Sequence, residues 1–355
     1  MIHDFYVEFW DEHKRSADFN KVDGISDTYH KIKLTSLNLI TEKSKRRVRE
    51  NKYRYWVKTE YPESIGSKLT LIEKLSISNP KTPNLPLSLL IKIKFQLRKP
   101  YLSKDDEEFY IIENPVCKDK FLKIPIVRPS SWKGILRWVA LNMLLSKLPL
   151  DKYAAFRERA NLIRLFGNEK DKIERFLDDI FNEKYSSDDP KKTVSQEFFE
   201  YILNKNYVNK DGNGMGRLIF FSTFFNGIGL DIIAPHKRET KTVKVPILFE
   251  VVPVVPTSKG TFILLYVPFD ILHNKGRLRE EVPKDLEILK EVIPKMMLEY
   301  GFSAKKTSGY GVVEEELIEV RVNDQVKSNV LFDEFRNMID LEVRRMMSNE
   351  YCSTT

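Results

Sequence analysis

The chain has 355 residues, 42% of them hydrophobic, and carries a formal net charge of +8. This length allows two domains or one domain with large insertions, and the hydrophobic content is ample for a packed core. The excess of lysine and arginine favours a polyanionic partner, although it is spread along the chain rather than gathered in one tail.

The cysteine content and the lack of long apolar segments indicate the cellular setting. Only Cys117 and Cys352 are present, so we expect no disulfide framework, and a reducing cytosol suits the chain. The first residues lack the basic and apolar regions of a signal peptide. No apolar run approaches the ~20 residues of a membrane span. We therefore expect a cytoplasmic protein without a membrane partner.

The first 84 residues form a charged opening segment, and Pro80 and Pro83 mark its boundary. Inside it, cations interleave with Tyr53, Tyr55 and Trp56. The cations are Lys43, Lys45, Arg46, Arg47, Arg49, Lys52, Arg54 and Lys58. Cations bind phosphate and aromatic faces stack bases, so this mixture suits single-stranded nucleic acid. A solvated helix face with its aromatic residues turned into a core explains the pattern equally well.

A period-two alternation of apolar and polar residues beginning at Leu89 predicts a β-strand. Lys92 and Lys94 lie on its polar face, which is therefore largely basic. A long polar loop follows the strand. It contains Glu113 within the sequence Ile-Glu-Asn-Pro-Val-Cys-Lys-Asp.

The sequence Arg-Pro-Ser-Ser-Trp-Lys-Gly-Ile-Leu-Arg begins at Arg128 and is typical of a loop that turns into a helix. Arg128 precedes a proline and is biased toward extended geometry, and Ser130 or Ser131 is expected to cap the first turn. Lys133 and Arg137 are four residues apart and so share one helix face. A capped helix N-terminus beside two cations can bind phosphate. An ordinary amphipathic helix with solvated cations is the simpler alternative.

Charged helices are expected over 154–166, 171–184 and about 196–203, with Gly167 ending the first. A glycine-rich turn at Gly212–Gly216 does not match a nucleotide-binding fingerprint, because no strand precedes it and no Walker lysine follows. A strand is then expected over 217–225.

Two further strands are expected over 245–255 and 261–267. The basic stretch between the 217–225 strand and these two contains His236, Lys237 and Arg238. A helix over 285–300 should kink at Pro294.

A second unusual stretch, Ala-Lys-Lys-Thr-Ser-Gly-Tyr-Gly, begins at Ala304. Two glycines beside lysines and hydroxyls let a backbone approach another chain closely. A strand over 312–322 and a final helix over 331–347 follow.

The order of these segments resembles the RAMP superfamily (repeat-associated mysterious proteins), the CRISPR-associated backbone subunits of type III effector complexes. That family usually carries Pro-Gly-Ser-Ser-Leu-Lys-Gly-x-Leu-Arg and a closing glycine-rich loop. Here Arg128-Pro129 stands in place of Pro-Gly, and Trp132 in place of a leucine. The resemblance covers about Leu89 to Glu316.

The resemblance implies an α+β fold with a ferredoxin-like, RRM-like βαββαβ core and an antiparallel sheet. A RAMP domain over 85–322 would carry large helical insertions, chiefly at about 150–210, after an N-terminal extension over 1–84. Residues 323–355 would form a C-terminal helix docked on the core.

The resemblance also implies binding of CRISPR RNA and target RNA, alongside other type III CRISPR subunits, for antiviral interference. Such subunits stack along the guide, so head-to-tail self-association is expected. No cofactor is expected. The residues expected to contact RNA are Arg128, Ser130, Ser131, Lys133, Arg137, Lys305, Lys306, Ser308, Gly309, Tyr310, Gly311, His236, Lys237, Arg238, Lys92 and Lys94.

Glu113 stands where target-cutting members of the family present an aspartate from an Ile-Asp-x-Pro-Val pattern. Glutamate keeps the charge but adds a methylene, which displaces a carboxylate whose position matters. With Asp105 or Asp106, it could still support metal-dependent endoribonuclease activity, and a divalent metal is expected only in that case. The interpretation that we favour is a subunit that holds RNA without cutting it.

Overall fold

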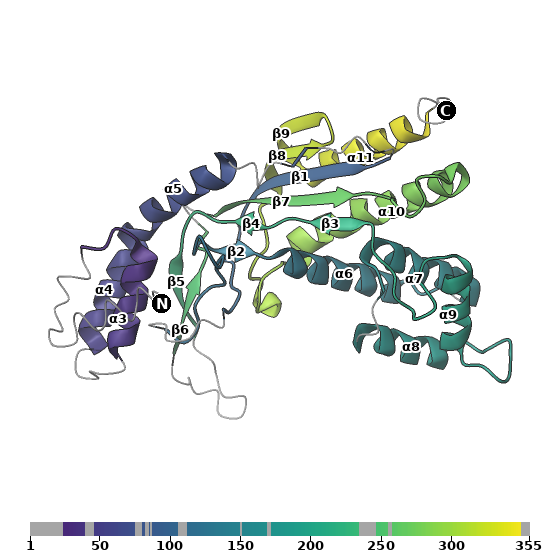
Figure 1. The fold of residues 1–355 in the computed structure, drawn as a ribbon, viewed down its shortest axis with the longest axis horizontal. Helices are drawn as coiled ribbons and strands as arrows, with labels where there is room; N and C mark the ends of the chain where they lie inside the picture. Colours follow the sequence, from purple (N-terminus) through teal and green to yellow (C-terminus); the bar gives the residue numbers. More distant parts are fainter. Residues whose placement is uncertain are drawn as a thin grey trace, which may run out of the picture.

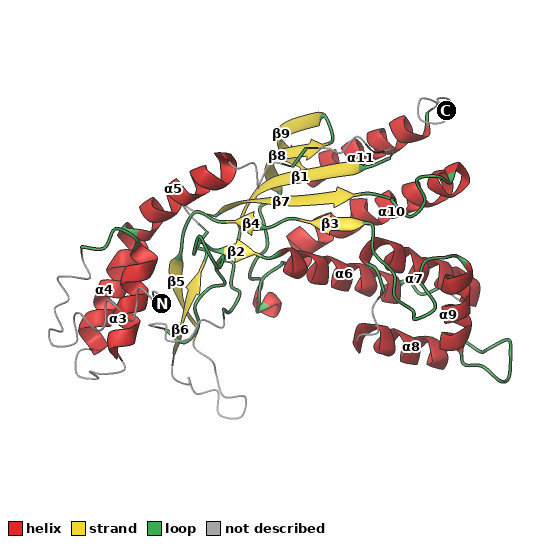
Figure 2. Ribbon diagram, viewed as in Figure 1, coloured by secondary structure: helices red, strands yellow, loops and turns green. Residues whose placement is uncertain are grey.

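The computed structural model describes residues 24–39, 46–74, 80–81, 85, 87–105, 112–149, 151–168, 172–233, 246–254 and 258–348. It shows a mixed fold with many helices and an antiparallel sheet (Figure 1; Figure 2). The sheet has five strands in the order β3-β7-β1-β8-β9. These are β1 (Leu89–Gln96), β3 (Leu218–Phe220), β7 (Lys259–Tyr266), β8 (Glu316–Val322) and β9 (Gln325–Leu331).

The central strand β1 follows its sequence alternation. Ile93 is fully buried, whereas Lys92 is half-buried and Lys94 is exposed on the opposite face. Ile93 pairs with Phe262 of β7 on one side and with Val320 of β8 on the other. Because this register aligns the apolar residues of three strands, one face of the sheet becomes the floor of the main core.

Helices cover that apolar face. In chain order, α6 (Pro129–Ser146) is the first helix after β1, and α10 (Lys275–Lys295) lies between β7 and β8. Helix α10 contacts both α6 and the last helix, α11 (Phe332–Met347). Pro294 lies inside α10, and a π-helical turn over Met296–Tyr300 follows the helix directly.

Three N-terminal helices, α3 (Thr28–Leu39), α4 (Arg46–Thr59) and α5 (Tyr61–Lys74), lie at one end of the molecule (Figure 1). Tyr53 and Trp56 of α4 are buried in the same hydrophobic cluster as the sheet, whereas Tyr55 is 59% exposed. For these residues the core interpretation therefore holds, and Tyr53 and Trp56 do not form a stacking surface.

A helical insertion at the other end has its own core (Figure 1). It consists of α7 (Lys152–Phe166), α8 (Lys172–Lys184) and α9 (Val194–Asn204). Gly167 ends α7 with φ of 81°, as expected from its sequence position. Asp151 and Thr193 cap α7 and α9 with side-chain hydrogen bonds.

Two smaller ribbons complete the fold: β2 (Ile126–Val127) pairs with β4 (Thr223–Phe224), and β5 (Gly229–Ile233) pairs with β6 (Ile247–Val251). The expected single strand over 217–225 is therefore wrong, because its two halves, β3 and β4, pair in different sheets. Strand β9 was also not expected. In the described part of the chain, no helix combines the length and apolarity needed to cross a membrane.

Candidate nucleic-acid interface

The start of α6 is built differently from expectation. Arg128 is the N-cap residue, Pro129 occupies the first turn, and no side chain caps the helix. Ser130 and Ser131 lie inside the first turn and are exposed, so the expected serine cap is wrong. The reason is Pro129, whose fixed φ suits the first helical position and makes Arg128, two residues before Ser130, the N-cap.

The glycine-rich stretch forms a tight turn. Lys305 has φ of 56°, Gly309 of 78° and Gly311 of 73°, all in the left-handed region. A Cβ at Gly311 would lie 2.5 Å from the Cβ of Ser303, so only glycine fits there. The Gly311 amide donates to the Pro100 carbonyl at 2.9 Å, which ties the turn to the chain leaving β1.

Helix α6 and this turn meet, although 170 or so residues separate them in sequence. The Nζ of Lys306 lies 4.2 Å from the centre of the Trp138 ring. Nearby, the rings of Trp132 and Phe302 have centroids 4.5 Å apart. Burial lowers the pKa of Lys306. We call this meeting of Trp138 of α6 with Lys306 of the turn 305–311 the α6–turn junction.

The turn also contacts the β5–β6 ribbon. Lys305 Nζ lies 5.1 Å from the centre of the Phe249 ring, and the Tyr310 hydroxyl donates to Asp231 at 2.6 Å. Burial and the Asp231 carboxylate raise the pKa of Tyr310 to about 12. The turn is therefore held between α6 and the ribbon.

The remaining α6 cations have different surroundings. Arg128 is exposed and lies 3.7 Å from Asp105. Lys133 is half-buried. Arg137 donates to Glu174 of α8 at 2.7 Å, and both side chains are largely buried. Arg137 thus anchors the helical insertion to α6, which the sequence spacing did not indicate.

Lys92 and Lys94 lie on the sheet face that α6 does not cover. Burial, with Arg321 beside it on β8, lowers the pKa of Lys92. Lys94 and Lys259 line a cavity of about 200 Å³ with Asn226, bordered by apolar residues of α5. These lysines therefore form a basic area separate from the α6–turn junction. The expected contacts His236, Lys237 and Arg238 lie outside the described residues.

The loop that carries Glu113 is fixed by a buried ion pair. Lys118 Nζ lies 2.5 Å from Glu250 of β6, and both side chains are almost inaccessible to solvent. The hydroxyl of Tyr53 donates to the same carboxylate at 2.6 Å, so α4 is tied to this loop. Glu113 itself is exposed. Among described residues, no group of three or more metal-binding side chains is gathered, and Asp106 is outside them.

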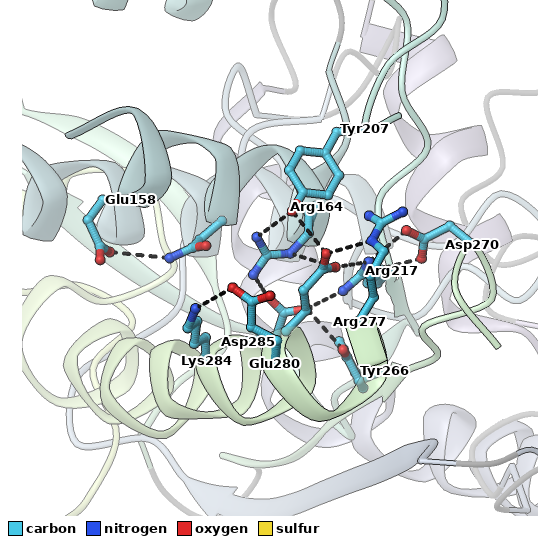
Figure 3. Close-up of polar contacts among 12 residues, drawn as sticks. Glu158, Arg164, Tyr207, Arg217, Tyr266, Asp270, Arg277, Glu280, Lys284 and Asp285 are labelled. Atoms are coloured by element: carbon cyan, nitrogen blue, oxygen red, sulfur yellow. Dashed lines mark hydrogen bonds and ion pairs between the residues drawn. The ribbon is translucent and has the colours of Figure 1, made fainter. Parts of the chain in front are cut away.

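Sequence reasoning missed a second charged centre (Figure 3). Arg217, only 1% exposed, lies 2.6 Å from Asp270, 2.5 Å from Glu281 and 2.8 Å from Asp285. Arg164 of α7 lies 2.6 Å from Asp285. Tyr207, Tyr266 and Arg277 complete this buried ion cluster. It joins α7, the residue before β3, strand β7 and α10, which are distant in sequence, so no local pattern could have indicated it.

Sequence reasoning also missed Trp138. Trp138 is six residues from the buried Trp132 and lies on a different face of α6. No signal in the sequence showed that the glycine-rich turn would reach it.

Comparison with known proteins gives a family match. The model of the RAMP superfamily matches residues 56–314. The match begins inside α4, earlier than the resemblance expected near Leu89. A search of curated protein sequences finds no match.

Solved structures of CRISPR complexes contain chains similar to this one. One, from a cryo-EM structure of the Type III-B Cmr-beta bound to cognate target RNA, is 14% identical, with a TM-score of 0.46. That alignment covers 90% of this chain and 98% of the other. A second, from a CRISPR RNA-guided surveillance complex in a pre-nicking state, is 12% identical with a TM-score of 0.36. It covers 74% of this chain and 89% of the other.

Proposed function

Because the chain belongs to the RAMP superfamily, we propose that it is an RNA-binding backbone subunit of a type III CRISPR effector complex. In this role it holds CRISPR RNA for pairing with target RNA, alongside other subunits of the complex. The protein then contacts backbone and shape while base pairing reads the sequence.

The α6–turn junction is the observation that carries this proposal. The exposed first turn of α6 presents the positive end of the helix dipole. Lys305 and Lys306 extend from the glycine-rich turn over the rings of Phe249 and Trp138, and among the described residues neither lies in ion-pair contact with a carboxylate. Cations that are not neutralised internally remain available to phosphate.

We further infer that the core is the ferredoxin-like, RRM-like unit of the family. The elements β1-α6-β3-β7-α10-β8 run in that βαββαβ sequence, and the strand order β3-β7-β1-β8 with all neighbours antiparallel supports the assignment.

A salt titration with a single-stranded CRISPR-type RNA tests the function. We expect the affinity to fall steeply as salt rises from about 50 to 200 mM. In a Lys305→Ala/Lys306→Ala variant, affinity should fall and the log–log salt slope should become less negative by about 0.7 for each phosphate that the variant no longer neutralises.

The matched control is Lys191→Ala/Lys205→Ala, which removes two exposed lysines from the helical insertion. This control should bind RNA as the unmodified protein does. An RNA affinity that does not change with salt concentration would refute the proposed RNA-binding surface. Equal losses of affinity in the two double variants would refute it as well.

A further inference from the structure

A cavity of about 200 Å³ lies between α5 and the face of the sheet that α6 does not cover. Hydrogen bonds within the protein fix its walls. The Thr223 hydroxyl donates to the Thr261 carbonyl at 2.6 Å, and the Phe225 amide donates to the Pro125 carbonyl at 3.0 Å. Segment 222–226 is therefore attached both to β7 and to the residue before β2, so the cavity is preformed.

Two lysines line the cavity, and its described lining residues include no carboxylate. Lys94 of β1 pairs with Thr261 of β7, and Lys259 lies two residues from Thr261 on the same face, so the two lysines are diagonal neighbours. Both are exposed, and among the described residues neither is within ion-pair distance of a carboxylate. Glu319 of β8 lies beside Lys94, but on the side of β1 that faces away from β7. The cavity therefore favours an anion.

The other walls combine hydrogen-bonding groups with apolar ones. Ser222 and Thr261 contribute hydroxyls. The side-chain oxygen of Asn226 is buried without a hydrogen-bond partner in the described structure, so an N–H group of a ligand would satisfy it. Leu69 of α5 and the ring of Phe224 supply an apolar side, and an aromatic ring can stack a base. An anionic group, N–H groups and a flat ring occur together in a nucleotide.

We propose that this cavity binds a nucleoside monophosphate, with the phosphate between Lys94 and Lys259 and the base against Phe224 and α5. A free nucleotide and the phosphorylated end of an RNA strand present the same chemical group, and either is a source of the ligand. The site is separate from the α6–turn junction, so it goes beyond the proposed function and does not depend on it.

Calorimetric titration of the full chain with adenosine monophosphate tests the site. We expect binding, and we expect adenosine, which lacks the phosphate, to bind about tenfold more weakly because it loses the charge-assisted contacts. If only an RNA with a terminal phosphate binds more tightly than the same RNA without it, the ligand is the RNA end. If a phosphate strengthens binding of neither the nucleoside nor the RNA, the proposal is overturned.

Lys94→Ala/Lys259→Ala should remove the preference for the phosphorylated ligand. Its affinity for that ligand should fall about tenfold, while the midpoint of thermal unfolding stays the same because both lysines are exposed. Lys191→Ala/Lys205→Ala, which removes two exposed lysines from the helical insertion, is the matched control and should bind the ligand unchanged. Equal losses in the two double variants would attribute binding to net charge and overturn the site.

Asn226→Ala separates ligand binding from a structural role. It should weaken binding of adenosine monophosphate several-fold without lowering the midpoint of thermal unfolding, because it removes a buried acceptor that has no partner in the described structure. Unchanged affinity in this variant would overturn the placement of the base beside Asn226. Nucleotide binding by a protein that fails to bind single-stranded RNA would retain this site and refute the proposed function alone.

Discussion

The buried ion cluster and the α6–turn junction use positive charge in opposite ways. In the cluster, Arg217 meets Asp270 at 2.6 Å and Asp285 at 2.8 Å, and is closed off from solvent. At the junction, Lys306 meets the face of Trp138. Paired and buried charges hold elements together, whereas a cation placed on an aromatic face keeps its charge for a partner. Net charge alone therefore says little about where an anion binds.

Removing a cation from the cluster should have the largest effect. Arg217→Ala leaves Glu281 and Asp285 buried with fewer partners, so we expect a loss of about 3–5 kcal/mol in the free energy of unfolding. Urea unfolding measures it. The exposed Arg175→Ala in α8 should cost less than about 0.5 kcal/mol. Similar losses in the two variants would break the contrast between buried and exposed cations.

Acid should remove the contribution of Glu281 to the cluster, whereas burial raises the pKa of Asp285, whose contribution therefore has the opposite sign. Burial opposes ionisation of Glu281, but the guanidinium groups of Arg164 and Arg217 outweigh it and hold its pKa below the ordinary 4.5. Between the folded pKa and pH 4.5, Glu281 is protonated in the unfolded chain but ionised in the folded one. The stability that its ionised form contributes is therefore complete above pH 4.5 and is lost as pH falls through the folded pKa. Glu281→Gln should flatten that part of the stability–pH curve. An unchanged curve would contradict the assignment.

The smallest effect is expected at an exposed carboxylate. Glu113→Ala should change the free energy of unfolding by less than about 0.5 kcal/mol, because Glu113 is exposed while its loop is fixed by Glu250. RNA affinity should stay the same. In an assembled complex the target-RNA cleavage pattern should also stay the same, as for a subunit that does not cut. Loss of regularly spaced cuts would instead establish the nuclease alternative.

Local signals predicted the helices well. The apolar stripe of α6, the glycine that ends α7 and the alternation in β1 each depend on neighbours in sequence, and each element occurs where expected. The predicted boundaries of the elements were less accurate. Helix α10 begins at Lys275, ten residues earlier than expected, because Asn274 caps it and Pro283 is accommodated inside it.

The candidate interface was predictable only in part. The sequence identified α6 and the glycine-rich turn as separate candidates, and the contact of Trp138 with Lys306 brings them together in the structure. The sequence did not show that Arg137 would bind Glu174, because this pairing depends on how α8 folds back. The binding of RNA by each of the expected residues, and the division of the chain into domains, stay predictions.

The hydrogen bond from Tyr53 to Glu250 limits how far the chain can be shortened from its start. A protein lacking its first three described helices would uncover apolar surface beneath Trp56 and leave the Lys118–Glu250 pair without its hydroxyl donor. Such a truncated form should aggregate on expression rather than yield a smaller working unit.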